Sequence, residues 1–520
     1  MSDIRPVPRT CKSIQISRGK LFRISWCQIK MRLRLAIALL FLRATAAAPA
    51  TLAIVNARVW TGDPARPFAE AIATSGDRVL AVGSNAGIRA LAAGTVIDGA
   101  GATLTPGFID SHIHLLVFDR NRPYPPIFMR YLTTRRQVAD RISAYAAKLP
   151  KGAWILGEDW TDALWAVQPP SRAWLDRIAP DHPVWLTRIE GASGIANSAA
   201  LRAAGFGAQT PGLVGGGNMW RIEAAIIEPF RERDERIVEH AMDLLLRAGV
   251  TSAQHNNAWY DFLILRRLHQ AGRRRIRVYD SPPLPAWERL RDYIREFGRG
   301  DAWMHWGGLK GFTVVTEPDY YRWVSGASSC GLQVMVHLGS EAELRTLLGV
   351  FLRVRREQHL ADPRFRLEHA HDLPPDVIPL VAEARAIPSW QPALLAHFAA
   401  RTAAGQLAPR NLFPARAVLD AGVKIAFGTD SSPAYSLVAP VQTLQIAMEH
   451  AMSLDQALRA HTLDAAYAEF AENEKGSLQA GKLADFVLFD RDLSRLPVHQ
   501  IHEAKVRLTV VGGRIMYDSR

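Results

Sequence analysis

Hydrophobic and polar positions follow one pattern at both ends of this chain. Residues 51–105 and 484–519 consist of short apolar runs broken by turn residues such as Gly, Asp and Pro, which is typical of β-strands. Each end alone would leave an unpaired sheet edge and half a hydrophobic core. We therefore expect residues 51–105 and 456–520 to pair into one small composite β-sandwich.

A different pattern fills the middle of the chain, where eight apolar β-like runs alternate with stretches of helical periodicity. The run LQVMVHL, for example, is followed by EAELRTLLGVFLRVRREQ and then by RFRLEHA. Continuous apolar strands separated by helices are typical of a parallel sheet that is buried on both faces. We predict an α/β fold in which residues 106–455 form a distorted (β/α)8 TIM barrel. A doubly wound open sheet is the alternative, but no G-x-G-x-x-G motif follows a first strand.

One stretch of the middle region breaks this alternation. Residues 119–235 are rich in Trp and Pro and are too long for a single crossover, so we expect an insertion between the first two barrel strands. Trp154, Trp160 and Trp165 lie in this stretch. We expect them to pack in a core, with the lining of an apolar substrate pocket as the alternative.

The charge of the chain at first indicates a polyanionic partner. The 520 residues are 48% apolar and 22% charged, which is ordinary for a globular protein, yet the formal net charge is +13. Residues 1–43 carry ten basic side chains and one acidic side chain, so +9 of this excess lies there and only +4 lies on the other 477 residues. No helix-turn-helix pattern or alternation of basic and aromatic residues appears, so we expect no nucleic-acid partner.

The basic segment has the layout of an export signal. From Met31 the sequence reads MRLR, then the apolar run LAIALLFL, then Arg43 and ATAAAPA. A basic region, a short apolar region and small residues in this order are typical of a secretory signal peptide. The apolar run is about half as long as a bilayer span, so we expect no stable membrane anchor. We predict that residues 1–50 are a leader, with the true start at Met31, and that the protein is periplasmic or secreted; the alternative is a basic tail on a cytoplasmic protein.

Candidate metal ligands stand at the ends of several predicted barrel strands. His112 and His114 close LTPGFIDSHIHL, and residues i and i+2 of a strand point to the same face, so both imidazoles can approach one ion. His337, His369 and Asp430 close three further strands, LQVMVHL, RFRLEHA and VKIAFGTD. Active sites of (β/α)8 barrels gather at these carboxyl ends. We interpret the five residues as a metal site, because packing alone does not explain their positions.

These stretches, together with GLKGF, SWQP and EKGSLQAGKLADFVLFDRD, resemble the metal-dependent amidohydrolase superfamily. Within it they are most similar to amidohydrolase family 3, which includes N-substituted formamide deformylase-like enzymes, over about residues 51–518. The resemblance implies a site for one or two divalent ions, expected to be Zn²⁺. It also implies that Lys310 in GLKGF bridges two ions once carboxylated, whereas an unmodified lysine indicates a single ion. The metal-site positions implied by the resemblance are His112, His114, Lys310, His337, His369 and Asp430.

The same resemblance implies a reaction. We expect hydrolysis of a non-peptide C–N bond (an amide, formamide or cyclic amide) in a small-molecule substrate by metal-activated water, with Asp430 as the catalytic proton acceptor. One alternative is an ester or lactone hydrolase, because the same hydroxide would attack those bonds. The other is a non-catalytic, metal-stabilised binding homologue. The substrate and the oligomeric state stay open, a homo-oligomer included.

The second alternative arises because several substrate-positioning motifs depart from the family pattern. Ala192 stands where relatives carry a His within R-x-D-G-H, and VVTEPDYY follows GLKGF in place of the usual loop. The His that usually follows Gln-Pro is missing from SWQPALL, although His397 is nearby. The metal ligands are thus retained while groups around the substrate differ.

Four further features have plainer interpretations. We expect Glu368 to point to the opposite strand face from His369 and to pack or pair structurally. His371 is expected either beside the site or at the barrel rim. We expect residues 273–275, three consecutive arginines, on the solvated surface. Cys330, the single cysteine beyond the leader, is expected to pack as a small apolar side chain.

Overall fold

The structure is a computed structural model. It describes residues 49–116, 127–129, 132, 134–160, 170–188, 193–215, 218–226, 231–256, 259–311, 317–395, 411–431 and 439–520. Residues Ala50–Arg520 form one compact unit. Residues 1–48 of the predicted leader, Trp165, Ala192 and His397 lie outside the described residues, whereas Ala50, the last residue of the predicted leader, already belongs to the first strand, Ala50–Val55. Within the described part, no helix is long and apolar enough to cross a membrane.

Parallel and antiparallel strands both occur, so the fold is α/β with mixed sheets. Two of the sheets are wholly parallel, with the strand orders β16-β15-β14-β8 and β17-β18-β19-β20-β21. Their strands are β8 (Phe108–Ile113), β14 (Val250–Asn256), β15 (Arg277–Ser281), β16 (Met304–Trp306), β17 (Gly308–Gly311), β18 (Gln333–His337), β19 (Arg366–Glu368), β20 (Ile387–Trp390) and β21 (Ala426–Phe427).

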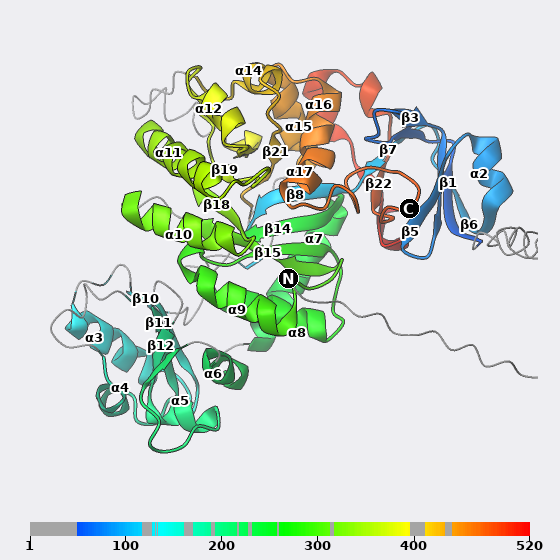
Figure 1. The fold of residues 1–520 in the computed structure, drawn as a ribbon. Helices are drawn as coiled ribbons and strands as arrows, with labels where there is room; N and C mark the ends of the chain where they lie inside the picture. Colours follow the sequence, from blue (N-terminus) through cyan, green and yellow to red (C-terminus); the bar gives the residue numbers. More distant parts are fainter. Residues whose placement is uncertain are drawn as a thin grey trace, which may run out of the picture. The chain divides into compact units, whose positions relative to one another are not determined.

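Helices follow these strands and cover the parallel sheets (Figure 1). Helix α11 (Glu341–Glu357) shows why: Leu344, Leu347, Leu348 and Phe351 form a buried stripe at helical spacing, and the Ser340 side chain caps the first turn by accepting from the backbone N of Glu343. The other helices of this region are α7 (Arg231–Arg247), α8 (Trp259–Gln270), η4 (Leu284–Ala286), α9 (Trp287–Phe297), α10 (Glu317–Ser329), α12 (Ile378–Glu383), η5 (Pro392–Leu394), α14 (Ala415–Asp420), α15 (Pro440–Glu449), α16 (Leu454–Ala460) and α17 (Leu463–Ala468).

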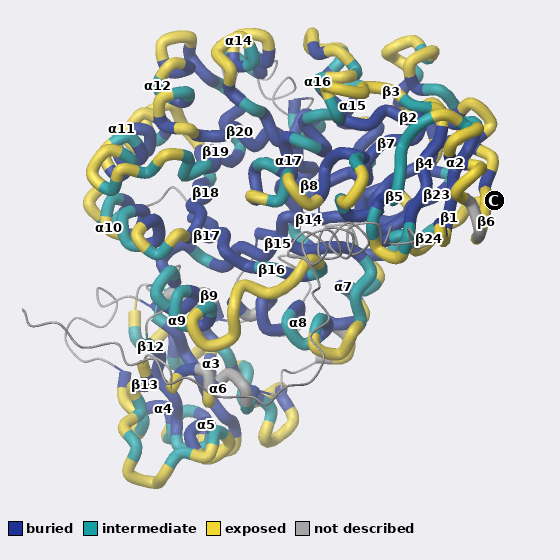
Figure 2. The backbone as a smooth tube through the Cα atoms, turned by 45° about the vertical axis from the view of Figure 1, so that its right-hand side comes forward, coloured by how far each residue is buried: buried dark blue, intermediate teal, exposed yellow. Residues whose placement is uncertain are grey.

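Hydrogen bonds join the two parallel sheets at two places, between β8 and the segment after β21 and between β17 and the segment after β15. At the first, the backbone N of Asp430 donates to His112 O (2.8 Å) and the backbone N of His114 donates to Ser431 O (2.9 Å). At the second, the backbone N of Lys310 donates to Pro282 O (2.8 Å). The carboxyl ends of β8, β18, β19 and β21 therefore come together on one side. Figure 2 shows these strands as a buried interior, with the exposed positions on the surrounding helices and loops.

The two ends of the described chain share one sheet of order β24-β23-β22-β7-β2-β3. Strand β22 (Phe486–Phe489) pairs antiparallel with β7 (Thr103–Pro106), so that Leu488 lies opposite Leu104. A hydrophobic cluster joins this sheet to a second one of order β5-β4-β1-β6, since it contains Phe486 from the first and Ile72 from the second. The remaining elements here are β1 (Ala50–Val55), β2 (Arg58–Trp60), β3 (Phe68–Ala69), β4 (Ala71–Ser75), β5 (Arg78–Gly83), α2 (Asn85–Leu91), β6 (Ala92–Asp98), η6 (Leu493–Arg495), η7 (Val498–Glu503), β23 (Val506–Val511) and β24 (Arg514–Asp518).

The segment between β8 and β14 has a sheet of its own, of order β13-β12-β11-β10-β9 (Figure 1). Trp160 lies in the hydrophobic cluster of this sheet and Trp154 in the main cluster, and both are buried, which confirms core packing for these two. The elements are β9 (Ile127–Phe128), α3 (Arg135–Ala146), β10 (Ile155–Trp160), α4 (Arg172–Ile178), β11 (Val184–Arg188), β12 (Ser193–Ala196), α5 (Ser198–Ala203), β13 (Leu213–Gly215) and α6 (Met219–Ala225).

Two smaller expectations also have outcomes in this part of the chain. Residues 273–275 lie at the surface, as expected, but they form ion pairs: Arg273 contacts Glu239 (2.6 Å) and Arg275 contacts Asp243 (2.5 Å) on α7. Cys330 is partly buried and packs against the main hydrophobic cluster, which confirms its interpretation as a small apolar side chain.

Candidate metal centre

His112 and His114 reach the candidate site from the end of β8. The chain of β21 continues through Gly428, which packs directly onto His112: a Cβ on Gly428 would lie 2.5 Å from the backbone N of His112. No other residue fits there, because real Cβ atoms do not approach so closely. The glycine therefore lets Asp430, two residues later, stand beside the two histidines.

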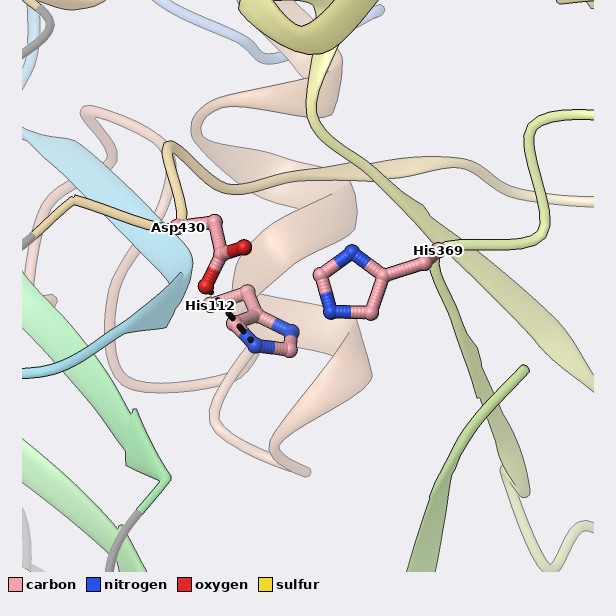
Figure 3. Close-up of side chains that lie close together, drawn as sticks. All are labelled: His112, His369 and Asp430. Carbon is pink, nitrogen blue, oxygen red and sulfur yellow. Dashed lines mark ion pairs between the residues drawn. The ribbon is translucent and has the colours of Figure 1, made fainter. Parts of the chain in front are cut away.

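His369 and Asp430 turn towards the site because their backbones are left-handed. Their φ angles are +63° and +53°, which few non-glycine residues adopt and which costs on the order of 1–3 kcal/mol each. Neighbouring strands hold both conformations: the backbone N of His369 donates to Ser389 O (3.1 Å), and that of Asp430 donates to His112 O (2.8 Å). Figure 3 shows the side chains of His112, His369 and Asp430 converging from β8 and from the segments that follow β19 and β21.

The possible ligand atoms of His112, His369 and Asp430 all lie within 4.8 Å of one another. Nε2 of His112 is 3.5 Å from Asp430 Oδ1, and Nε2 of His114 is 3.2 Å from the same oxygen. Imidazole nitrogens and a carboxylate oxygen are the ligands that Zn²⁺ and similar divalent ions accept. The three residues are thus close enough to share one ion.

The hydrogen bonds of the two β8 histidines show that a cation fits between them and Asp430. Nδ1 of His112 contacts a Glu368 carboxylate oxygen, and Nδ1 of His114 is 2.7 Å from the carbonyl oxygen of Asn256. Both oxygens are acceptors, so each ring donates its Nδ1 proton to one of them. Burial lowers the pKa of His112 well below its usual value, so this ring is neutral and the lone pair of its Nε2 faces Asp430 at 3.5 Å. A positive ion between that lone pair and the carboxylate stabilises the arrangement.

The other two predicted residues, Lys310 and His337, adjoin this group. Nζ of Lys310 is 3.5 Å from His112 Nε2, and the ring of His337 lies 4.5 Å from that of His369, centroid to centroid. The structure thus brings all six predicted residues into one continuous cluster.

Burial sets the protonation states of the cluster. It lowers the pKa of His112 and His369 well below the usual value and that of His337 to about 4, so these rings are neutral, the form that binds metals. Burial also lowers the pKa of Lys310 to about 8. For Asp430, burial would raise the pKa, but the contact with His114 and the nearby charges lower it to about 2, so the carboxylate is ionised.

The expectation for Glu368 is confirmed in one part and corrected in the other. Glu368 is fully buried and pairs with the Arg366 guanidinium (2.8 Å), as expected, but its carboxylate also contacts Nδ1 of His112, so it does not point away from the cluster. The alternation of side chains along β19 ends at Glu368, because the left-handed backbone of His369 turns the His369 side chain to the same side as that of Glu368. A pair of opposite charges two residues apart in an apolar strand is the sequence signal that could have revealed this role.

Asp110 and His371 complete the surroundings of the cluster. Asp110 was not predicted; it accepts from Thr429 Oγ1 (2.6 Å) and from the backbone N of Thr429 (3.0 Å), and thereby ties β8 to the segment that holds Asp430. Burial raises the pKa of Asp110 to about 7. His371 is buried, and its Nε2 accepts from the backbone N of Gln391 (3.0 Å), so it lies beside the site and not at an exposed rim.

A family model described as the amidohydrolase family matches residues 95–517. This chain belongs to the amidohydrolase family. The resemblance found in its motifs is thereby confirmed, and the metal-ligand pattern of His, Lys and Asp described above lies wholly within the matched residues.

Curated relatives of similar length include proteins with quite different names. The protein LONG AFTER FAR-RED 3 of Arabidopsis thaliana is 28% identical, over 90% of this chain and 92% of that one. The N-substituted formamide deformylase of Arthrobacter pascens is 25% identical, over 90% and 98%. A shorter match links 20% of this chain to 25% of an imidazolonepropionase of Bdellovibrio bacteriovorus, at 36% identity.

Solved structures share the fold of this amidohydrolase. An uncharacterized metal-dependent hydrolase from Pyrococcus furiosus aligns with a TM-score of 0.55 at 21% identity, over 85% of this chain and 99% of that one. The atrazine chlorohydrolase of Arthrobacter aurescens, solved in complex with zinc, aligns with a TM-score of 0.55 at 17% identity, over 90% and 95%. The amidohydrolase fold of metal-dependent hydrolases is therefore shared along most of the chain.

Proposed function

We propose that this protein is a metal-dependent hydrolase that cleaves a non-peptide C–N bond, such as that of an amide, formamide or cyclic amide. The observation that carries the proposal is the approach of His112, His369 and Asp430 to within 4.8 Å at the carboxyl ends of parallel strands. Membership of the amidohydrolase family supports it, as do the names of two relatives, an N-substituted formamide deformylase and an imidazolonepropionase.

His112, His369 and Asp430 would hold one divalent ion, which we propose to be Zn²⁺, with His114, His337 and Lys310 contributing to the same ion or to a second one. The zinc complex of a structural neighbour supports this choice. When bound, such an ion supplies Lewis-acid chemistry: it lowers the pKa of a water molecule and polarises a substrate carbonyl.

Asp430 is the residue to which we assign proton transfer. Its low pKa keeps the carboxylate ionised, and Oδ1 already receives the contacts with His112 and His114. Oδ2 is therefore the atom that would take the proton of the attacking water and return it to the leaving nitrogen.

Glu368 and Arg366 are positioning residues in this proposal. The Glu368 carboxylate fixes the proton of His112 on Nδ1, so that Nε2 faces the metal position. Arg366 holds Glu368 in turn and also contacts the backbone oxygen of Ser111 in β8. Such outer partners fix the orientation and basicity of a ligating histidine.

We also propose the finer architecture, with residues 106–455 as a distorted (β/α)8 barrel and residues 51–105 and 456–520 as a β-sandwich. The hydrogen bonds that join the two parallel sheets support the barrel, and the shared hydrophobic cluster of the terminal sheets supports the sandwich. Export through the leader of residues 1–50 remains a proposal from sequence. An intact leader on protein isolated from its native host would contradict it.

Metal analysis combined with a panel of formamides, N-acyl compounds, cyclic amides, esters and lactones tests the function. We expect bound metal and turnover of at least one C–N substrate. Bound metal without turnover on any of them would favour the non-catalytic binding homologue, and turnover of esters or lactones alone would favour an ester or lactone hydrolase.

The variant Asp430→Asn tests the assigned role. We expect turnover to be abolished while the metal content stays largely intact, because the amide oxygen can still ligate but cannot take a proton. Asp420→Asn is the matched control, since Asp420 pairs with Arg416 on the exposed surface of α14 (2.8 Å). Turnover like that of the wild type in Asp430→Asn would overturn the assignment.

A further inference from the structure

A cavity of about 560 Å³ lies at the end of the parallel strands opposite to the metal centre. Gln333, the first residue of β18, lines it, whereas His337, the last residue of the same strand, belongs to the metal cluster. Four residues of a strand span roughly 13 Å, so the two sites are separate. We call this cavity the amino-end pocket; its polar lining residues in this argument are Tyr279, Arg299, His305, Gln333, Glu469 and Lys475.

A buried ion pair forms the floor of the amino-end pocket. Nζ of Lys475 lies 2.6 Å from Glu469 Oε1 and 2.5 Å from Ser252 Oγ, and both charged side chains are almost fully buried. Glu469 Oε2 accepts no hydrogen bond from any residue that the structure describes, and Nε2 of His305, at 3.7 Å, is too distant to donate. A buried carboxylate oxygen without a donor is unfavourable, so the floor is complete only when a donor enters the pocket.

The mouth of the pocket offers the opposite charge. Arg299 is exposed, and its guanidinium donates to the carbonyl oxygen of Gly331 (2.9 Å) but pairs with no carboxylate in the described part of the chain. The two acidic residues at the mouth are already paired, Glu474 with Arg78 (2.6 Å) and Asp301 with Arg274 (3.5 Å). In the described part of the chain, Arg299 is thus a cation without an anionic partner, in a pocket whose floor carries a carboxylate oxygen, Glu469 Oε2, without a hydrogen-bond donor.

Aromatic side chains supply the remaining wall. The rings of Tyr279 and His305 pack at 4.7 Å, centroid to centroid, and Trp306 and Phe470 also line the cavity. Burial lowers the pKa of His305 to about 4, so the imidazole adds no charge. Apolar walls with a few convergent polar groups are typical of sites for small molecules, and a volume of this size suits them.

We propose that the amino-end pocket binds a small amino-acid-like molecule, with its ammonium group on Glu469 Oε2, its carboxylate on Arg299 and its apolar body against Tyr279, Trp306 and Phe470. The three parts of the ligand match the three unmet features of the pocket: an acceptor that lacks a donor, a cation that lacks an anion, and an aromatic wall. This site is independent of the proposed hydrolysis, because no residue of the metal cluster lines it.

Calorimetric titration of the full-length, metal-loaded protein with L-phenylalanine tests the proposal. We expect one site per chain. Phenethylamine lacks the carboxylate and 3-phenylpropionate lacks the ammonium group, so each should bind about 10- to 100-fold more weakly, the value of one charge-assisted hydrogen bond. Absence of L-phenylalanine binding at 10 mM, or equal affinity for all three compounds, would overturn the proposal.

Arg299→Ala separates the two ends of the ligand. We expect it to reduce the affinity for L-phenylalanine to that for phenethylamine and to leave phenethylamine binding unchanged. Arg345→Ala is the control, because Arg345 is an equally exposed arginine on α11 and should change neither affinity. An Arg299→Ala protein that binds L-phenylalanine as the wild type does would refute the assignment of the carboxylate.

Glu469→Gln and metal removal complete the test. Glu469→Gln should weaken phenethylamine binding; should this variant not fold, the Arg299 comparison decides alone, since that side chain is exposed. Because amino acids also chelate metals, the titration is repeated after the metal has been stripped with a chelator. Binding must persist, and its loss would place the ligand at the metal centre and contradict the proposal.

Discussion

Replacing Glu368 by glutamine tests the most specific feature of the metal centre. Glu368 is fully buried between His112, whose Nδ1 contacts its carboxylate, and Arg366, with which it forms an ion pair. A glutamine has nearly the same shape but one donor end and one acceptor end. If its oxygen accepts from His112, its amino group faces the donors of Arg366. If it is reversed, it donates to Nδ1 of His112, and the imidazole proton moves to Nε2, the atom that faces Asp430.

Either orientation therefore loses one charge-assisted hydrogen bond, which costs roughly 1.5–3 kcal/mol. Loss of a carboxylate that orients a ligating histidine typically lowers metal affinity about 10- to 100-fold, or about 1.4–2.8 kcal/mol. The cost of the lost hydrogen bond and the free-energy equivalent of this affinity loss are of the same size, so we expect Glu368→Gln to bind Zn²⁺ about 10- to 100-fold more weakly. The fold should also lose several kcal/mol of unfolding free energy, roughly 3–5, because Arg366 stays buried without its full partner.

Competition with a chromophoric chelator measures the Zn²⁺ affinity of the stripped protein, and urea unfolding followed by circular dichroism measures its stability. Glu357→Gln is the matched control, because Glu357 pairs with Arg353 at 2.8 Å on the exposed face of α11, where ion pairs contribute little. A folded Glu368→Gln protein with a Zn²⁺ affinity within twofold of the wild type would show that Glu368 does not orient His112.

Three further variants probe other parts of the structure. Gly428→Ala would place a Cβ 2.5 Å from the backbone N of His112, so we expect it to lower the unfolding free energy by about 1–3 kcal/mol and to reduce the bound metal. Gly349→Ala, in open space on α11, is the control and should change neither quantity. If urea unfolding and metal analysis gave the same result for both variants, the close packing of Gly428 on His112 would be refuted. Burial lowers the pKa of His461 to about 4, so below pH 6.5 the unfolded chain binds a proton that the native protein does not, and stability falls as the pH falls. His461 alone should lower the unfolding free energy of the wild type by about 2 kcal/mol between pH 7.5 and pH 5.0. In His461→Gln, the drop in unfolding free energy between these two pH values should be smaller by that amount. Lys310→Ala removes the amine that lies 3.5 Å from His112 Nε2; if Lys310 bridges two ions, metal analysis should find two per chain in the wild type and one in the variant, and equal counts in both would exclude a bridging lysine.

Much of the candidate site could be predicted because its residues stand at strand ends. His112 and His114 share a strand face, and the ends of β8, β18, β19 and β21 meet on one side of the parallel sheets. The position of a residue at the end of one of these strands is therefore enough to predict that its side chain lies near the others. Glu368 could not be predicted in the same way. Its orientation depends on the left-handed backbone of His369, whose N–H donates a hydrogen bond to the carbonyl oxygen of Ser389 in the next strand.

The insertion and the amino-end pocket show two other limits of sequence patterns. The length of the segment after β8 indicated an insertion, but two of its strands, β9 and β13, have two and three residues, too few to show a period. The pocket combines Tyr279, Gln333 and Glu469, which come from distant parts of the chain and share no spacing. Only the fold places them around one cavity.

The pairing of β7 with β22 has a consequence for how the protein is made. Leu104 and its partner Leu488 are 384 residues apart, so at about 5–20 residues per second the ribosome delivers β22 about 20–80 s after β7. During this time the edge of β7 is open to pairing with other chains. This sheet, begun early with β2, is thus among the last completed, and a chain that ended shortly before β22 would leave β7 without its partner strand.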